Sequence, residues 1–267
     1  MTSTYVPSPH AAMGRPVSEF HVPQPVPQGA AIREIREGRG FFVDSSGMSG
    51  DWLSCSSCHL NGGTDLRVLP LVGVATTFPR MVRRYHRWMT LSQRINRCVV
   101  NSLAGRSLGA HDPDRRDLTA YLYWLSTGYA KGSRLPWLRH PTLLEPDSPP
   151  NVAHGKKLYH HDCAYCHGPR GMGFFHGSMA PPLWGPHSYT RGAGMDRMAE
   201  LAAFIKAAMP AVPLGGVAPG GLSATHAKDL AAFILKHPRP KVAIGVGDSS
   251  SDIGHHPHGV SSTKRDL

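Results

Sequence analysis

Two short cysteine motifs have the residue types and spacing needed to hold a haem. Each reads Cys-x-x-Cys-His, one at residues 55–59 and the other at residues 163–167. In such a motif, two thiols reach the two vinyl groups of one haem, and the following histidine ligates its iron. The alternative is a zinc or redox Cys-x-x-Cys that happens to precede a histidine, which two complete copies disfavour. The sequence therefore predicts two covalently bound haem c groups, attached through Cys55 and Cys58 with His59 as iron ligand, and through Cys163 and Cys166 with His167.

The elements that must position these motifs occur twice, in the order helix, motif, loop, helix and closing helix. Capping residues, apolar periodicity and Pro or Gly stops predict helices over 30–42, 90–105 and 112–128, and again over 151–161, 195–209 and 223–237. No run suggests alternating strands. We therefore expect an all-α fold with two tandem cytochrome c domains, 29–130 and 151–240. A Pro-rich linker (131–150) joins them, and disordered segments (1–28 and 241–267) flank them.

The predicted helix over 90–105 carries the remaining reactive side chain. Thr90 and Gln93 form a Thr-x-x-Gln capping box at its start, and Gly105 is placed for a left-handed C-terminal cap. Arg94, Cys98 and Ser102 follow at steps of four, so they lie on one face. Whatever group Cys98 contacts thus has a guanidinium and a hydroxyl one turn to either side.

The charge balance restricts the class of partner. The 267 residues include 29 Lys and Arg against 18 Asp and Glu, a formal net charge of +11. We find neither a basic groove interleaved with aromatic residues nor a DNA-reading motif, which argues against nucleic acid. A positive field favours an anionic small substrate or an acidic redox protein instead. We also expect no membrane span, because no stretch approaches about 20 apolar residues.

The expected location follows from the haem attachment. Covalent attachment of this kind implies an oxidising compartment outside the cytoplasm, so we expect the periplasm. Residues 1–20 lack the apolar core of a signal peptide, which leaves the route of export unexplained.

The first haem needs a distal ligand, and Cys98 is the best candidate for it. Four of the five cysteines belong to the motifs, so Cys98 is left over. A thiolate ligand would stabilise Fe(III) and give this haem the lower potential. Three kinds of alternative stay open: an inert buried thiol, a dimer disulfide, and ligation by another side chain from the set Met81, Met89, His86 and His111.

The second haem is expected to have a methionine on its distal side. Met209 precedes a proline near the end of a predicted helix, and a thioether ligand raises the potential. Other side chains that could take this position are Met172, Met179, Met195 and Lys206. Two haems with unlike ligands predict a direction: electrons enter at the His/Cys haem and leave through the His/Met haem. A thiolate ligand beside arginine suggests chemistry on a sulfur oxyanion, which arginine binds by forked hydrogen bonds.

At this point the chain resembles the dihaem thiosulfate dehydrogenases, also called tetrathionate synthases. The resemblance runs from about residue 32 to residue 240, and the combination of motifs makes it fairly specific. The stretches that carry it are 53–60 (LSCSSCHL), 91–98 with its Arg-Ile-Asn-x-Cys core, Ser102-x-x-Gly105, 121–126 (Tyr-x-x-Trp-Leu-Ser), 181–186 (PPLWGP), 192–195 (GAGM), and Phe204-Ile205-Lys206 with Met209-Pro210.

The resemblance implies an enzyme that joins two thiosulfates into tetrathionate and passes two electrons to an acceptor cytochrome; some members run the reverse reaction. It implies that the active site is the distal side of the first haem. There Cys98 matches a haem-ligating cysteine that takes part covalently. Arg84, Arg94 and Ser102 match positions used around the substrate, Arg84 less securely than the other two. Some members have a lysine before the second haem's methionine, where this chain has Ala208.

Two other functions compete with this one. A dihaem electron carrier with no substrate of its own would have methionine ligands at both haems. An enzyme with the same ligation could act on another sulfur substrate, such as a carrier-bound sulfur in the manner of the Sox-type dihaem cytochromes. Spectra of the oxidised protein separate the first alternative from the enzyme, and activity on free thiosulfate separates the second.

Overall fold

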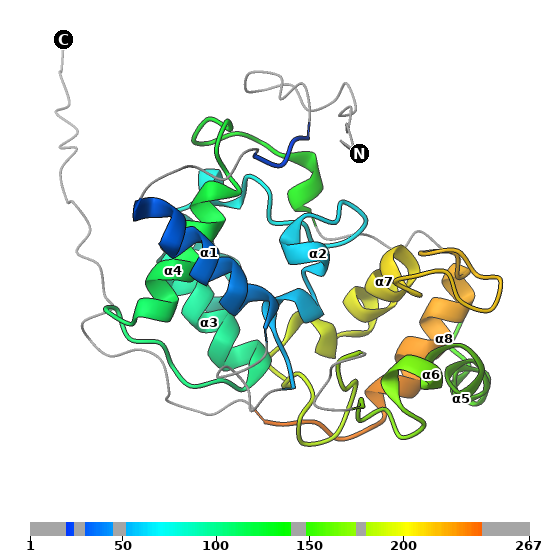
Figure 1. Ribbon diagram of the computed structural model, residues 1–267. Helices are drawn as coiled ribbons and strands as arrows, with labels where there is room; N and C mark the ends of the chain where they lie inside the picture. The colour runs from blue at the N-terminus through cyan, green and yellow to red at the C-terminus, as the bar shows by residue number, and fades with distance from the viewer. Residues whose placement is uncertain (1–19, 24–29, 45–51, 140–147, 175–179, 242–267) are drawn as a thin grey trace, which may run out of the picture.

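The structure is a computed structural model that describes residues 20–23, 30–44, 52–139, 148–174 and 180–241. It is mostly helical and has two halves, with α1, α3 and α4 in one and α5 to α8 in the other (Figure 1). Within the described ranges, every helix is too short or too polar to cross a lipid bilayer. The expected all-α class with two successive units is thus confirmed.

The first half contains the longer helices. Its elements are α1 (Ala30–Val43), the 3₁₀ helix η1 (Cys55–Ser57), α2 (Leu60–Gly63), η2 (Val74–Thr77), β1 (Arg80–Val82), η3 (Arg83–Tyr85), β2 (Arg87–Met89), α3 (Leu91–Leu103), α4 (Pro113–Trp124) and η4 (Pro136–Leu138).

The second half repeats the order of helix, motif, loop and two further helices. Its elements are α5 (Val152–Leu158), the single π-helical turn η5 (Tyr159–Cys163), α6 (Ala164–His167), the 3₁₀ helix η7 (Gly194–Asp196), α7 (Met198–Ala208) and α8 (Ala224–Leu235).

Most helices begin where the sequence predicts, but α7 begins at Met198 and not at the predicted residue 195, which lies in the separate 3₁₀ helix η7. At α3, the Thr90 hydroxyl accepts from Gln93 N (3.2 Å) and Gln93 Oε1 accepts from Thr90 N (2.9 Å), so the predicted capping box forms. The predicted left-handed cap at Gly105 is wrong. Helix α3 ends sooner, and Ala104 adopts the left-handed conformation (φ 56°). Gly105 N then donates back to the carbonyl of Val99 (3.0 Å).

One glycine in each half lets the first helix cross the last one at close range. A Cβ on Gly38 of α1 would lie 1.9 Å from the carbonyl oxygen of Asp117 in α4. A Cβ on Gly155 of α5 would lie 2.0 Å from the carbonyl oxygen of Asp229 in α8. The two halves therefore use the same device, in which backbones touch because one helix has no side chain at the crossing.

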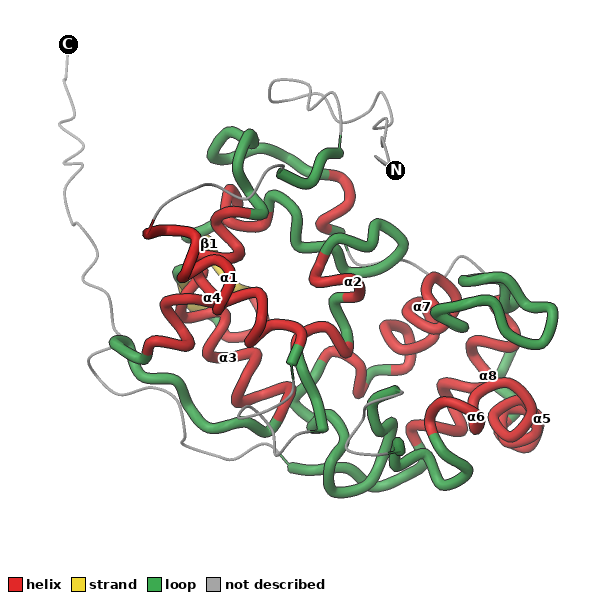
Figure 2. Tube along the Cα trace, viewed as in Figure 1, coloured by secondary structure: helices red, strands yellow, loops and turns green. Residues whose placement is uncertain are grey.

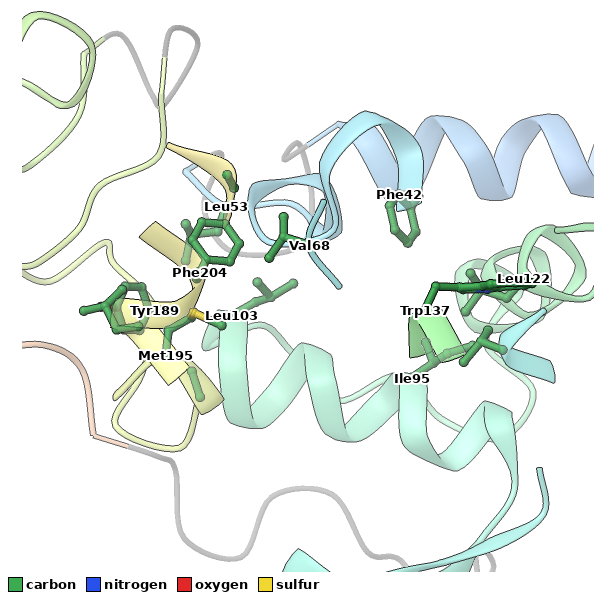
Figure 3. Close-up of a cluster of buried hydrophobic side chains, with 14 of the residues drawn as sticks. Phe42, Leu53, Val68, Ile95, Leu103, Leu122, Trp137, Tyr189, Met195 and Phe204 are labelled. Carbon is green, nitrogen blue, oxygen red and sulfur yellow. The ribbon is translucent and has the colours of Figure 1, made fainter. Parts of the chain in front are cut away.

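The core of the first half is built from α1, α3 and the loops between them. Figure 3 shows Phe42 of α1 and Val68 of the following loop pointing toward Ile95 and Leu103 of α3. All four are at most 8% exposed. The inward faces expected for α4 (Leu118, Tyr121, Leu122 and Leu125) and α8 (Ala227, Leu230, Phe233 and Ile234) are also buried.

A short β-hairpin lies just before α3, and the sequence did not indicate it. Strands β1 and β2 pair antiparallel, with Met81 opposite Trp88, and are drawn in yellow in Figure 2. His86 turns the chain with a left-handed backbone (φ 51°). The hairpin carries several arginines and ends directly before α3.

The packed part of the first half extends beyond the predicted limits of 29 and 130. Phe20 is buried against Trp137, with ring centroids 5.3 Å apart and edge-to-face geometry. Trp137 Nε1 donates to the carbonyl of Val72 (2.8 Å). These two aromatic rings therefore tie residues from the predicted N-terminal segment and the predicted linker to the first domain. Of the predicted tails, residues 1–19, 24–28 and 242–267 lie outside the described residues.

Candidate haem and sulfur-chemistry site

The first cysteine motif forms a single 3₁₀ turn followed by a fixed imidazole. Cys55 begins η1, and His59 follows directly after the turn. His59 Nδ1 hydrogen bonds to the carbonyl of Leu69 (2.7 Å). This bond orients the ring and makes Nδ1 the protonated nitrogen, which leaves Nε2 as the metal-binding atom.

The second motif orients its histidine in the same way as the first, although the backbone around its cysteines forms a different kind of helix. Cys163 ends the π-helical turn, and α6 carries the chain on to His167. His167 Nδ1 hydrogen bonds to the carbonyl of Pro181 (2.8 Å). The ring is 8% exposed, and its burial lowers the pKa of His167, which favours the neutral imidazole that binds metals.

The residues of both motifs fit a covalently attached haem. All five cysteines, each of them in the described ranges, are free thiols. Burial, and then the nearby Cys98 sulfur, raises the pKa of Cys58 to about 12, and the same two causes raise the pKa of Cys55. Burial raises the pKa of Cys163 to about 12. Each motif thus offers half-buried, unpaired thiols beside an oriented imidazole.

Helix α3 brings Arg94 and Cys98 into direct contact. Arg94 Nη1 donates to Cys98 Sγ over 2.6 Å, one helical turn apart. The negative charge available on Cys98 is the first cause that raises the pKa of Arg94, ahead of burial, which lowers it. Since Cys98 also perturbs the cysteines of the first motif, its sulfur faces the same interior as they do.

The structure gives fewer contacts for the other two predicted substrate residues, Ser102 and Arg84. Ser102 is half-buried and lies one turn after Cys98 on α3, and its backbone carbonyl accepts from Thr190 N (3.0 Å). Arg84 lies in η3, at the tip of the hairpin, and its side chain is outside the described part of the structure.

Two residues that the sequence analysis missed surround Arg94. Burial, and then the like charge of Arg94, lowers the pKa of Arg80, so these guanidinium groups are near each other. Arg80 also lies over the ring of Phe78, 4.8 Å from its centroid. Tyr85 is among the groups that raise the pKa of Arg94, and its hydroxyl accepts from Asn101 Nδ2 (3.3 Å). The hairpin supplies both Arg80 and Tyr85, and its strands are too short to give a sequence signal.

Three of the four alternative distal ligands in the first half are exposed. His86 and His111 are exposed, and Met81 is 46% exposed on the hairpin. Met89 is buried in β2, only 1% exposed. Cys98 is the candidate that is close enough to the first motif to raise the pKa of its cysteines. It also accepts a hydrogen bond from the Arg94 guanidinium.

In the second half, Met209 directly follows α7 and packs against the core. Lys206, one turn earlier, directs its amine to the carbonyl of Gly220 (3.3 Å). Met195 is buried in the core, whereas Met172 is 37% exposed. Met179 is outside the described residues.

A loop of the second half joins it to the Cys98 helix. Figure 3 shows Leu53 and Leu103 of the first half beside Tyr189, Met195 and Phe204 of the second. All five side chains are buried. They form an apolar contact between the two halves next to the first motif.

Polar and aromatic contacts reinforce this junction. The buried Thr190 hydroxyl donates to the carbonyl of Asn101, and Thr190 N donates to the carbonyl of Ser102. Trp52, just before the first motif, stacks on His187 with ring centroids 4.6 Å apart and planes 11° apart. The loop therefore brings the second half close to both the first motif and the end of α3.

Two family profiles match successive parts of the chain. The profile described as "SoxA/TsdA, cytochrome c domain" matches residues 37–130. The profile described as "Cytochrome C oxidase, cbb3-type, subunit III" matches residues 150–234. These ranges correspond to the two structural halves, and both halves are cytochrome c domains.

Proteins named thiosulfate dehydrogenase match most of the chain. That of Allochromatium vinosum is 39% identical over 84% of this chain and 84% of its own length. That of Stutzerimonas stutzeri is 35% identical over 86% of this chain and 76% of its own length. The solved structure of thiosulfate dehydrogenase TsdBA from Marichromatium purpuratum superposes with a TM-score of 0.75 at 31% identity. It covers 83% of this chain, which spans half the length of that protein. The chain therefore belongs to the thiosulfate dehydrogenase family of enzymes.

Proposed function

We propose that this chain is a dihaem c-type cytochrome that oxidises thiosulfate to tetrathionate and delivers the electrons to an acceptor cytochrome. The observation that carries the proposal is the 2.6 Å contact between Arg94 and the Cys98 sulfur, close to the first cysteine motif. The names of the relatives supply the substrate. The reaction is balanced as two thiosulfate dianions giving one tetrathionate dianion and two electrons.

The two motifs would hold the cofactors. Cys55 and Cys58 would attach the first haem and Cys163 and Cys166 the second, and each His ring presents Nε2 to the iron because its Nδ1 is already bonded. Bound there, the haems supply one-electron redox chemistry. As distal ligands we assign Cys98 in the first half and Met209 in the second.

The side chains around Cys98 would supply the positive charge that the reaction requires. Two thiosulfate dianions repel each other, so a site that joins them must offer fixed positive charge. Arg94 donates a hydrogen bond to the Cys98 sulfur, which would stabilise a thiolate there, and Arg80 adds a second cation nearby. Ser102, one turn away, offers a hydroxyl to a sulfonate oxygen. Arg84, in η3 between the two strands, is the further arginine that this proposal assigns to the substrate.

Cys98 also offers a sulfur for covalent catalysis. The Cys98 thiolate and the outer sulfur of the first thiosulfate would form an S–S bond as two electrons leave to the haems, and the second thiosulfate would then displace the Cys98 thiolate to give tetrathionate. The coupling would thus be split into two easier steps. The half-buried Arg94 guanidinium would hold both partners of the new bond in line.

We infer that the second half is the electron exit. It docks beside the first motif through Tyr189 and Thr190, so electrons have a short path from one half to the other. A thioether ligand at Met209 would place its haem at the higher potential. The acceptor would be a c-type cytochrome or a similar redox protein, and the haem attachment indicates the periplasm.

The decisive test is tetrathionate formation by the purified holoprotein and its Cys98→Gly variant. We expect Cys98→Gly to abolish turnover while both haems stay attached, and Arg94→Gln to lower kcat/KM by at least 100-fold. Arg116→Gln is the matched charge control: its side chain lies exposed on α4, and we expect full activity. Assaying tetrathionate reduction in parallel gives the preferred direction.

Three results would count against the proposal. Full turnover by Cys98→Gly would remove the cysteine from the chemistry. A ferric spectrum without a thiolate signature, together with no turnover of thiosulfate, would indicate a dihaem electron carrier. Activity on a carrier-bound sulfur but not on free thiosulfate would indicate a Sox-type substrate.

A further inference from the structure

Arg239, just after α8, is a buried cation with an incomplete set of partners. Its side chain is 1% exposed. Nε lies 3.2 Å from Asp196 Oδ1, and Nη2 donates to the carbonyl of Ile234 (2.9 Å). The guanidinium carbon sits 4.5 Å from the centre of the Tyr189 ring.

Two buried donors in this cluster lack an acceptor. Arg239 Nη1 and Tyr189 Oη are both inaccessible to solvent, and neither has a hydrogen-bond partner among the described residues. A buried donor without an acceptor costs about 1–3 kcal/mol, and more when the group is charged. An N–H of a cation and a phenolic O–H, side by side, together suit the two oxygens of a carboxylate.

The described carboxylates of the second half already have partners. Asp196 pairs with Arg239 through Nε, and the buried Asp229 accepts from Asn151 N (2.6 Å) and pairs with His154 Nδ1 (2.7 Å). The missing acceptor therefore comes from a group that the protein binds. A haem c carries two propionate carboxylates, and the chain has two places for a haem.

The cluster lies between those two places. Tyr189 belongs to the loop that begins at Pro181, whose carbonyl orients the His167 ring. Burial raises the pKa of Tyr189 to about 12, against the effect of the adjacent Arg239 guanidinium, which lowers it, and Cys58 of the first motif is a smaller cause that raises it. The cluster is thus built in the second half on the side that faces the first.

We infer that Arg239 Nη1 and Tyr189 Oη bind the propionate carboxylate of a haem, with Asp196 holding the guanidinium in place. The inference rests on the proposed function only for the presence of the haems. The second haem is the expected owner, because Tyr189 and Arg239 belong to the domain that attaches it.

The consequence is a contribution to haem potential. A fixed positive charge near the iron disfavours Fe(III), so losing Arg239 should lower the potential of the haem whose propionate it binds. Coulomb interaction in a partly buried site leads us to expect about a tenfold change in the reduction equilibrium constant, or about 59 mV for one electron. Losing only the Tyr189 hydroxyl should give a smaller shift in the same haem.

The test is an EPR-monitored redox titration of the holoprotein, which follows each ferric haem separately. We expect Arg239→Gln to lower the potential of the second haem by the stated amount, Arg239→Lys to recover most of it, and Tyr189→Phe to shift it less. Arg191→Gln removes an exposed charge from the same loop and should move neither haem.

The outcomes are distinct from those of the turnover assay. A shift confined to the first haem would support the carboxylate site and assign it to that haem. Unchanged potentials in Tyr189→Phe and in a folded Arg239→Gln would overturn the inference, even with thiosulfate oxidation intact. Should Arg239→Gln fail to fold, Tyr189→Phe and Asp196→Asn still decide the question.

Discussion

The crossing of α1 over α4 gives the sharpest prediction, because two glycines of α1 differ only in what surrounds them. Gly38 faces α4, and a Cβ there would lie 1.9 Å from Asp117 O and 2.4 Å from its carbonyl carbon. Gly40, in the same helix, has nothing within 4 Å of a Cβ. The perturbation is Gly38→Ala, with Gly40→Ala as its matched control.

The magnitude follows from packing and helix propensity. Real Cβ atoms stay beyond 3.0 Å, so in Gly38→Ala the two backbones must separate by about 1 Å. Overpacking of this kind costs about 1–3 kcal/mol or more, while Ala gains up to about 1 kcal/mol over Gly in a helix. We expect Gly38→Ala to lose about 2 kcal/mol of unfolding free energy and Gly40→Ala to gain up to about 1 kcal/mol.

The assay is urea unfolding of the holoprotein followed by far-UV circular dichroism. Stability differences are read from the midpoint at a constant slope, which shows that the unfolding transition itself is unchanged. Because both variants change the same residue type in one helix, effects on the unfolded chain cancel. The reasoning is refuted if Gly38→Ala is as stable as Gly40→Ala.

Two further predictions concern the loop after the first motif. Tyr121→Phe leaves the buried Gly62 carbonyl without its 2.7 Å donor, so calorimetry should show a loss of about 1–3 kcal/mol. Tyr123→Phe, 57% exposed on the same helix, should change stability by less than about 0.5 kcal/mol, and equal losses in the two would contradict the assignment. The hydrogen bond from Arg67 lowers the pKa of Asp65, so this pair contributes stability above the ordinary carboxyl pKa of 3.8 and loses it as pH falls further. Asp65→Asn should flatten the acid side of the stability profile by at most about 1 kcal/mol, since the arginine is partly exposed, and an unchanged profile would show that the pair contributes nothing.

The sequence predicted the elements whose determinants are local. The haem motifs, the Thr90 capping box and the inward faces of α4 and α8 depend on residues within a few turns of one another. The contact between Arg94 and Cys98 was foreseeable for the same reason, since their spacing places them one helical turn apart.

The parts that the sequence did not predict depend on contacts between distant segments. The hairpin strands have three residues each, too few for an alternating pattern, so Arg80 and Tyr85 escaped notice. Tyr189 and Arg239 meet across fifty positions of sequence. Trp137 was assigned to a linker because its partner Phe20 lies far away in the chain.

The hydrogen bonds of Thr190 affect which side chains near the contact between the two halves can change during evolution. They end on main-chain oxygens of Asn101 and Ser102, and every amino acid presents an identical acceptor there. Under the function proposed above, the Ser102 side chain could therefore be exchanged, and with it a contact to the substrate, without undocking the neighbouring domain. On that proposal, substrate range and the docking of the two domains can evolve independently at this position.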